Sequence, residues 1–163
     1  YIQSWGQPKS LLEAVPFGID LSLYPFISQS RRQTQEPIIT VIGNMQWSPS
    51  LSAAKRLVGE LWPEIHRQIP QAKLRIVGWS ARENLKNFLD QPNIEILENV
   101  PDIQPYFEQA SVLVYAPGRG SGMKIKIQEA LAYGVPVVTT FEGVEGLQVQ
   151  DMVHVALGET NQE

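Results

Sequence analysis

The 163 residues contain 43 % hydrophobic and 18 % charged side chains, a balance typical of one globular domain rather than a disordered chain. The formal net charge of −4 argues against a surface that coats nucleic acid, so we expect no nucleic-acid partner. The chain has no cysteine, which excludes a disulfide framework and a thiolate metal site. Its two histidines, His66 and His154, show no ligand spacing, and we expect no metal.

No apolar run approaches the ~20 residues that cross a bilayer, and no signal peptide is visible. The chain begins at Tyr1 without an initiator methionine, so we expect a fragment of a longer protein. We expect that protein to be cytoplasmic, with any peripheral membrane attachment through parts outside this fragment.

Residues 1–36 are irregular, with a short strand predicted at 11–15 and a turn after it. From residue 38 onward, apolar runs predict strands at 38–42, 72–77, 94–97, 111–115, 135–139 and 152–156. Helical spacing of apolar residues predicts helices at 49–69, 81–90, 102–109 and 121–133. Ser48 is the expected cap of the first helix, with Pro49 at its first position.

Strands that alternate with helices predict an α/β fold, a Rossmann-like doubly wound parallel sheet of about six strands with helices on both faces. We expect residues 37–163 to form this domain and residues 1–36 to be a crossover or linker segment. Ligands of such sheets bind at the carboxyl ends of the strands. The glycine-bearing loops after residues 42 and 115 both lie there.

The window 117–127 carries three positive charges, Arg119, Lys124 and Lys126, and no negative one. The other residues sum to −7, because the whole chain is at −4 and this window at +3. The cluster lies on a turn that reads as the start of a helix, which already carries about half a positive charge. Such a concentration of cations favours a bound anion, and a phosphate is the obvious candidate.

Within this turn, Gly120 and Gly122 permit close backbone approach, and Ser121 is a suitable N-cap. The backbone amides of Met123 and Lys124 would then face the anion. A plain tight turn before a capped helix is the alternative. Residues 123–127 also alternate with period two, as in a strand, but the helix formers that follow favour the helix.

Lys126 and Glu129 share a helix face, where the ammonium could hold a phosphate and the carboxylate the ribose hydroxyls. An ordinary surface ion pair is the alternative. Lys124 points about 200° away from Lys126 on a helix, so both cannot face the same ligand, and the face shared with Glu129 favours Lys126 as the phosphate ligand. Backbone amides of Gly43 and Asn44 could touch a phosphate or sugar, or could form only a routine loop. No catalytic set is recognisable, so the catalytic residues stay unassigned.

The chain resembles the C-terminal, donor-binding domain of family 4 retaining glycosyltransferases with the GT-B fold. The resemblance covers residues 15–157. Six phrases carry it in order: VPFGID at 15–20, IGNMQWSPS at 42–50, IPQAKLRIVG at 69–78, GSGMKIKIQEA at 120–130, GVPVVTT at 134–140 and EGVEGL at 142–147.

The resemblance implies a hexosyltransferase-type enzyme that transfers a sugar, with retention, from a UDP- or GDP-sugar to an acceptor in carbohydrate biosynthesis. The backbone of 120–124 would hold the diphosphate, Lys126 would neutralise it, Glu129 would bind the ribose and the backbone near Val100 would meet the base. No cofactor beyond the nucleotide-sugar is implied. The acceptor, a glycan, lipid or small molecule, would need an N-terminal domain that is missing here, so we expect the fragment to be inactive alone.

Two departures from the family pattern affect the site. Ser121 stands where many members have the first Glu of an E-x7-E pair, and residues 43–52 lack the Arg and Lys that many members carry after the first strand. Arg119, Lys124 and Lys126 are the candidates to supply that charge. A non-catalytic nucleotide- or anion-binding module on the same fold is the alternative function. A flavodoxin-like receiver or interaction module is a third reading. It would need acidic residues after the first strand, and their absence at residues 43–45 argues against it.

Overall fold

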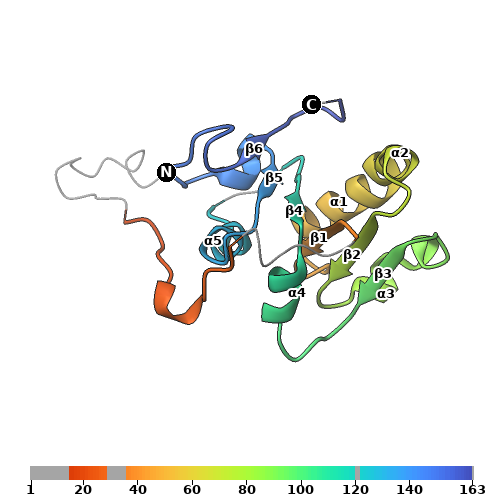
Figure 1. Cartoon of the computed structure of the whole chain (residues 1–163), viewed down its shortest axis with the longest axis horizontal. Coiled ribbons are helices and arrows are strands. Elements are labelled where there is room, and N and C mark those ends of the chain that lie inside the picture. The colour runs from red at the N-terminus through yellow and green to blue at the C-terminus, as the bar shows by residue number, and fades with distance from the viewer. Residues whose placement is uncertain (1–14, 29–35, 120–121, 163) are drawn as a thin grey trace, which may run out of the picture.

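The computed structural model describes residues 15–28, 36–119 and 122–162 (Figure 1). Within them, a six-stranded sheet has the order β3-β2-β1-β4-β5-β6, and every neighbouring pair is parallel. The strands are β1 (Ile38–Ile42), β2 (Lys73–Val77), β3 (Ile94–Leu97), β4 (Val112–Tyr115), β5 (Val137–Thr139) and β6 (Ala156–Leu157). This order confirms the predicted Rossmann-like fold.

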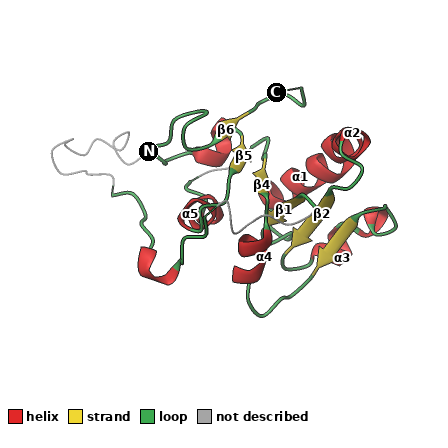
Figure 2. Cartoon of the chain, in the orientation of Figure 1, coloured by secondary structure: helices red, strands yellow, loops and turns green. Residues whose placement is uncertain are grey.

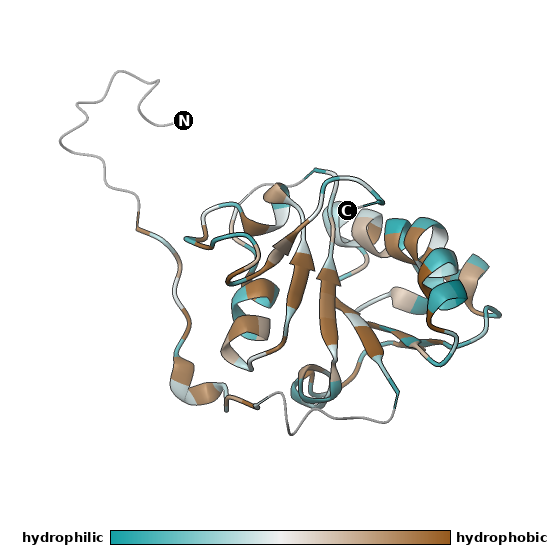
Figure 3. Cartoon of the chain, turned by 45° about the horizontal axis from the view of Figure 1, so that its top comes forward, coloured by the Kyte–Doolittle hydropathy of each residue, from teal (hydrophilic) through white to brown (hydrophobic). Residues whose placement is uncertain are grey.

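Helices cover both faces of the sheet (Figure 2). They are α1 (Ser48–Arg56), α2 (Trp62–Gln68), α3 (Ala81–Asn84), α4 (Gln104–Gln109) and α5 (Ile125–Ala132). Two separate apolar cores result, because alternate strand residues point to opposite faces. Val41 packs with α1 and α2 residues, whereas Leu113 packs with Phe107 of α4 and Ile127 of α5. Figure 3 shows the hydrophobic residues concentrated along the strands between these layers.

The helix predicted at 49–69 is interrupted. A π-helical stretch at Leu57–Leu61 separates α1 from α2, and the amide of Trp62 donates to the carbonyl of Leu57, five residues back. Pro63 explains the irregularity, since it has no amide hydrogen for the carbonyl of Gly59. The predicted cap is also wrong, because Trp47 occupies the N-cap position and no side chain caps the helix.

Helix α5 begins at Ile125, four residues later than the predicted start. Lys124 is its N-cap residue and has extended backbone angles, φ −105° and ψ 97°. Ser121 is therefore not the N-cap, and it lies outside the described residues together with Gly120. The period-two alternation of residues 123–127, which we set aside in favour of a helix, agrees with the extended backbone of Lys124 but not with the helical residues 125–127. The amides that open the helix are consequently those after Lys124, not those of Met123 and Lys124.

Strands β2, β4 and β5 and helix α4 begin one or two residues later than predicted, as β5 does at Val137, and three other elements differ more. The helix predicted at 81–90 consists of α3 and a 3₁₀ turn at Lys86–Phe88. The last strand is the two-residue β6, because residue 152 lies in a turn with φ 57°. The strand predicted at 11–15 falls almost wholly outside the described residues, and Val15 itself is irregular.

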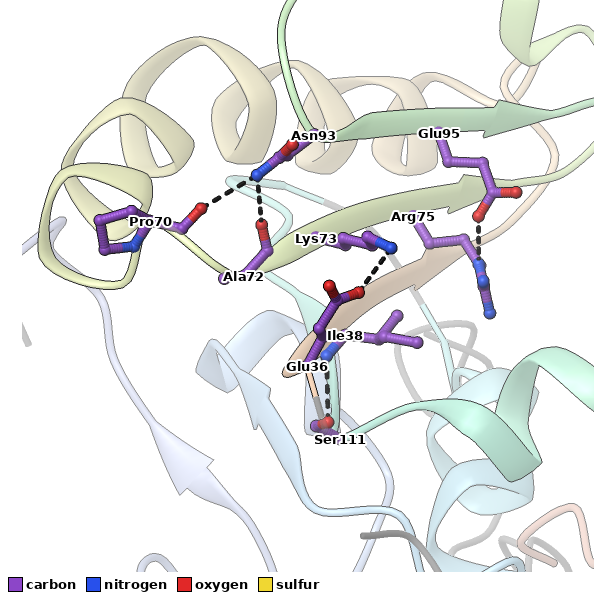
Figure 4. Close-up of polar contacts among 9 residues, drawn as sticks. All are labelled: Glu36, Ile38, Pro70, Ala72, Lys73, Arg75, Asn93, Glu95 and Ser111. Atoms are coloured by element: carbon purple, nitrogen blue, oxygen red, sulfur yellow. Dashed lines mark hydrogen bonds and ion pairs between the residues drawn. The ribbon is translucent and has the colours of Figure 1, made fainter. Parts of the chain in front are cut away.

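Polar side chains link neighbouring strands on the side of the sheet away from the site (Figure 4). At the amino end of β1, the Ser111 hydroxyl accepts a hydrogen bond from the amide of Ile38 at 3.0 Å, which ties the loop before β4 to β1. In the middle of β2, Arg75 Nε forms an ion pair at 2.6 Å with Glu95 Oε2, the residue opposite it in β3.

The segment 15–28 runs along α5 (Figure 1). The rings of Tyr24 and Tyr133 meet edge to face with centroids 5.2 Å apart. The amide of Ile27 donates to the carbonyl of Tyr133 at 3.1 Å, and Phe26 lies against Gly134. The described part of the expected linker thus packs on the domain.

Candidate functional site

The candidate site lies at the carboxyl ends of β1 and β4, where the strand order reverses. Such a switch point is where open α/β sheets bind their ligands. Gly43 follows β1, and Lys126 lies in the first turn of α5, which follows β4. The structure brings these two predicted residues together. A Cβ atom added to Gly43 would lie 2.6 Å from Lys126 Nζ.

The loops after β1 and β2 are packed tightly at this edge. The amide of Gly43 donates to the carbonyl of Val77 at 3.0 Å, and the amide of Met45 donates to the carbonyl of Trp79 at 2.9 Å. Gly78 has φ +155°, and a Cβ there would lie 1.7 Å from the carbonyl oxygen of Gly43. Only glycine fits at residue 78, so the backbone position of Gly43 is fixed by its neighbour.

Lys126 is anchored by two side chains. Its Nζ donates to the hydroxyl of Ser50, in α1, at 2.9 Å. The same Nζ lies 4.1 Å from the centroid of the Tyr115 ring, at the end of β4, in a cation–π contact. Ser50 and Tyr115 are both buried. The ammonium therefore occupies a defined place between β1 and β4.

Burial and, to a smaller extent, the positive charge of Lys124 lower the pKa of Lys126 to about 8, while the negative charge of Glu129 opposes the shift. Within the described residues, no ion pair includes Lys126. A desolvated ammonium without a carboxylate partner is unfavourable unless an anion neutralises it. The electrostatics of this position favour a negatively charged ligand.

Lys124 makes its side-chain contacts within its own loops. Its side chain is buried, its Nζ donates to the carbonyl of Gly122, and it lies 3.7 Å from Glu145 Oε2. These contacts hold the loop before α5 to the loop after β5. The prediction that Lys124 and Lys126 diverge is confirmed, but the reason is that Lys124 precedes the helix.

Glu129 lies one turn beyond Lys126 on α5. Its Oε1 accepts a hydrogen bond from the Tyr24 hydroxyl at 3.2 Å. Burial and the negative charge of Glu129 raise the pKa of Tyr24. Among the described contacts, the alternative of a surface ion pair with Lys126 is absent, and Glu129 is oriented by the crossover segment instead.

Met123 links the same crossover segment to the loop before α5. Its Sδ accepts a hydrogen bond from the amide of Phe17 at 3.3 Å, and its side chain packs against Gly146. Gln128 Nε2 donates to the carbonyl of Phe17 at 3.2 Å. The backbone of Phe17 is thus held from both sides, and its side chain is exposed.

The other predicted residues are dispersed around this centre. Arg119 is exposed, Gly122 has φ +73°, and Asn44 Oδ1 accepts a hydrogen bond from the amide of Gln46 at 2.9 Å. Val100 packs at the edge of the core beneath α4 and α5. Sequence reasoning missed Ser50 and Tyr115. Their only signal is position, because each lies beside the carboxyl end of a strand.

The described residues contain no group of three or more His, Cys, Asp or Glu side chains arranged to hold a metal ion. In the same part of the chain, every helix is too short or too polar to cross a membrane.

The sequence matches the family model for glycosyl transferases group 1 over residues 36–160. The match covers most of the chain, so the chain belongs to this family. An uncharacterized glycosyltransferase of Haemophilus influenzae is 30 % identical over 84 residues, which make up 48 % of this chain and 24 % of that protein. The chain therefore spans a small part of the length of this relative.

Solved structures of other proteins share the fold at low sequence identity. HepE of Anabaena, solved with UDP and glucose, is 17 % identical, with a TM-score of 0.72 over 98 % of this chain and 46 % of that chain. Sucrose-phosphate synthase of Thermosynechococcus elongatus is 22 % identical, with a TM-score of 0.56 over 78 % of this chain and 34 % of that chain. The fold is that of the C-terminal domain of a GT-B glycosyltransferase.

Proposed function

We propose that this chain is the donor-binding part of a retaining family 4 glycosyltransferase, and that it binds a nucleoside diphosphate sugar at the carboxyl ends of β1 and β4. The observation that carries the proposal is the Lys126 ammonium, partly buried at the switch point and free of any ion pair among the described residues. A diphosphate supplies the negative charge that this position lacks.

Glycosyl transfer creates negative charge on the leaving diphosphate as the bond to the sugar breaks. Lys126 would stabilise that charge, and its fixed position would make the stabilisation available without reorganisation. Glu129 would accept hydrogen bonds from the ribose hydroxyls. The backbone amides at the start of α5, which form the positive end of the helix dipole, would also stabilise the diphosphate. A hexose as the transferred sugar and a missing acceptor domain are parts of the same proposal.

UDP is the nucleotide that we propose to test first. HepE, which shares the fold, has been solved with UDP and with UDP-glucose. We expect titration of the protein with UDP and with GDP, followed by calorimetry or amide chemical shifts, to show binding centred on residues 122–129. Lys126→Met should weaken UDP binding by about tenfold or more, because a charge-assisted contact is lost. Unchanged binding in that variant would contradict the proposed site.

A non-catalytic nucleotide-binding module is the second candidate. One observation favours it: Ser121 stands where many family members have a carboxylate. An assay of the protein with UDP-glucose and a panel of acceptors separates the two. Binding without transfer or hydrolysis, by a protein that contains both domains, would favour the module.

A further inference from the structure

The surroundings of Lys126 form a directional chain of contacts from three segments distant in sequence. The ammonium of Lys126 donates to Ser50 Oγ at 2.9 Å, so the single hydroxyl proton of Ser50 remains available for another acceptor. A hydrogen bond between the side chains of Ser50 and Tyr115 lowers the pKa of the Tyr115 phenol, while burial, the larger effect, raises it. The face of the same Tyr115 ring carries the ammonium.

Gly43 provides the space for this arrangement. A Cβ atom at residue 43 would lie 2.6 Å from Lys126 Nζ, 2.9 Å from Ser50 Oγ and 3.2 Å from Ser50 Cβ. Contacts below about 3.0 Å do not occur for real side chains, so even alanine would displace the end of the lysine chain. The backbone of Gly43 does not need a left-handed conformation, because its φ lies outside that region. The requirement for glycine here is therefore space for the ammonium.

A lysine side chain needs such anchoring if it is to act as a fixed charge. It has four flexible methylenes and loses rotamer entropy when it is held in place. Lys124 repels it and Glu129 attracts it, and both lie on the same connection between β4 and β5. Without Ser50 and Tyr115, the ammonium of Lys126 would turn toward Glu129 or water.

We propose that Ser50 and Tyr115 are positioning residues of the donor site, and that Gly43 is the position whose size sets where the Lys126 ammonium meets the diphosphate of the nucleotide. This inference rests on the proposed function, because it assigns the same ammonium to the same anion. It adds that the charge is placed by a hydroxyl from α1 and an aromatic ring from β4.

The spectroscopic test uses the side-chain signal of Lys126. Because its ammonium lies over the Tyr115 ring, the Lys126 Cε protons should resonate upfield of those of the other lysines. Gly43→Ala and Ser50→Ala should each move this signal toward the position of a solvated lysine. Tyr115→Phe should retain most of the ring shift, because the ring remains. Gly59→Ala, whose Cβ would meet only the Phe88 ring at 3.7 Å, is the matched control and should leave the signal in place.

The binding test is a double-mutant cycle with UDP and with uridine as probes. Ser50→Ala should weaken UDP binding about three- to tenfold, and should leave uridine binding unchanged because uridine has no phosphate. In a Lys126→Met background, Ser50→Ala should have no further effect on UDP. A purely structural role for Ser50 would weaken UDP and uridine alike in both backgrounds.

The outcomes separate this inference from the proposed function. If Lys126→Met does not affect UDP binding, the proposed donor site is wrong and the inference falls with it. If Lys126→Met weakens UDP binding but Ser50→Ala and Gly43→Ala change neither affinity nor the lysine signal, the donor site stands and the positioning role is overturned. Tyr115→Phe keeps the inference testable if Ser50→Ala fails to fold, since it should weaken UDP binding by removing the phenol that hydrogen-bonds with Ser50.

Discussion

Lys124 and Lys126 are separated by one residue, yet their ammonium groups serve opposite purposes. Lys124 Nζ is directed back to the carbonyl of Gly122 and toward Glu145, within its own loops. Lys126 Nζ reaches across 76 residues of sequence to Ser50. The start of α5 at Ile125 separates them, because extended backbone before the helix points Lys124 away from the helical face that carries Lys126. One cation stabilises the loop, and the other is available to a ligand.

This difference predicts distinct effects of two matched substitutions. Lys124→Met should lower the free energy of unfolding by about 1–3 kcal/mol, because it leaves the Gly122 carbonyl without its charged donor. Its effect on UDP affinity should be smaller than that of Lys126→Met. Denaturant unfolding and calorimetric titration of both variants provide the check. A larger loss of UDP affinity in Lys124→Met than in Lys126→Met would reverse the assignment.

Lys126→Met should make the protein more stable at pH 7. The folded-state pKa of Lys126 is lowered from 10.5 to about 8, so the folded state disfavours the charged form. The resulting destabilisation is fully present below pH 8 and disappears as the pH rises from 8 to 10.5, where the unfolded state binds more protons. We expect the free energy of unfolding to increase by about 1–2 kcal/mol. This is less than the full pKa shift implies, because the Lys126 side chain is only partly buried.

Urea unfolding of the wild type and Lys126→Met at pH 7, 9 and 10 measures this difference. The advantage of the variant should shrink across that range. An equal difference at all three pH values would show that Lys126 has an unperturbed pKa. The expected combination of higher stability with weaker UDP binding is the usual cost of a preorganised site.

UDP affinity should depend on the charge of Lys126. Since a bound diphosphate favours the ammonium, the affinity should be constant from pH 7 to about 8 and then fall by up to tenfold per pH unit as free Lys126 loses its proton. The second ionisation of a phosphate, near pH 6, is complete in this range and does not contribute. Isothermal titrations between pH 7 and 9.5 would show the decline, and in Lys126→Met the profile should be flat.

The sequence predicted the framework of this site better than its centre. The strands at 38–42 and 94–97 match the structure residue for residue. The first is a continuous, almost wholly apolar β-branched run that is buried on both faces, whereas the second, at the edge of the sheet, alternates between apolar Ile94 and Ile96 and the exposed Glu95. The start of α5 was predicted wrongly, since good helix formers after residue 127 outweighed the alternation before it. Ser50 and Tyr115 could not be found from the sequence. Their contact with Lys126 is tertiary, and Ser50 looks like any small residue on the buried face of α1.

Gly78→Ala should be among the most destabilising single substitutions in the described part of the chain. Its Cβ would lie 1.7 Å from the carbonyl oxygen of Gly43, which is backbone and cannot turn aside, and φ +155° is unfavourable for alanine. We expect a loss of at least about 3 kcal/mol, together with loss of UDP binding, because Gly43 and the lysine it accommodates would move. Gly59→Ala, in the helical stretch between α1 and α2, should instead be neutral or gain up to about 1 kcal/mol, because it replaces a flexible residue at a compatible site. Thermal unfolding of both variants compares the two directly, and similar midpoints would show that the carboxyl ends of β1 and β2 are less tightly packed than the structure indicates.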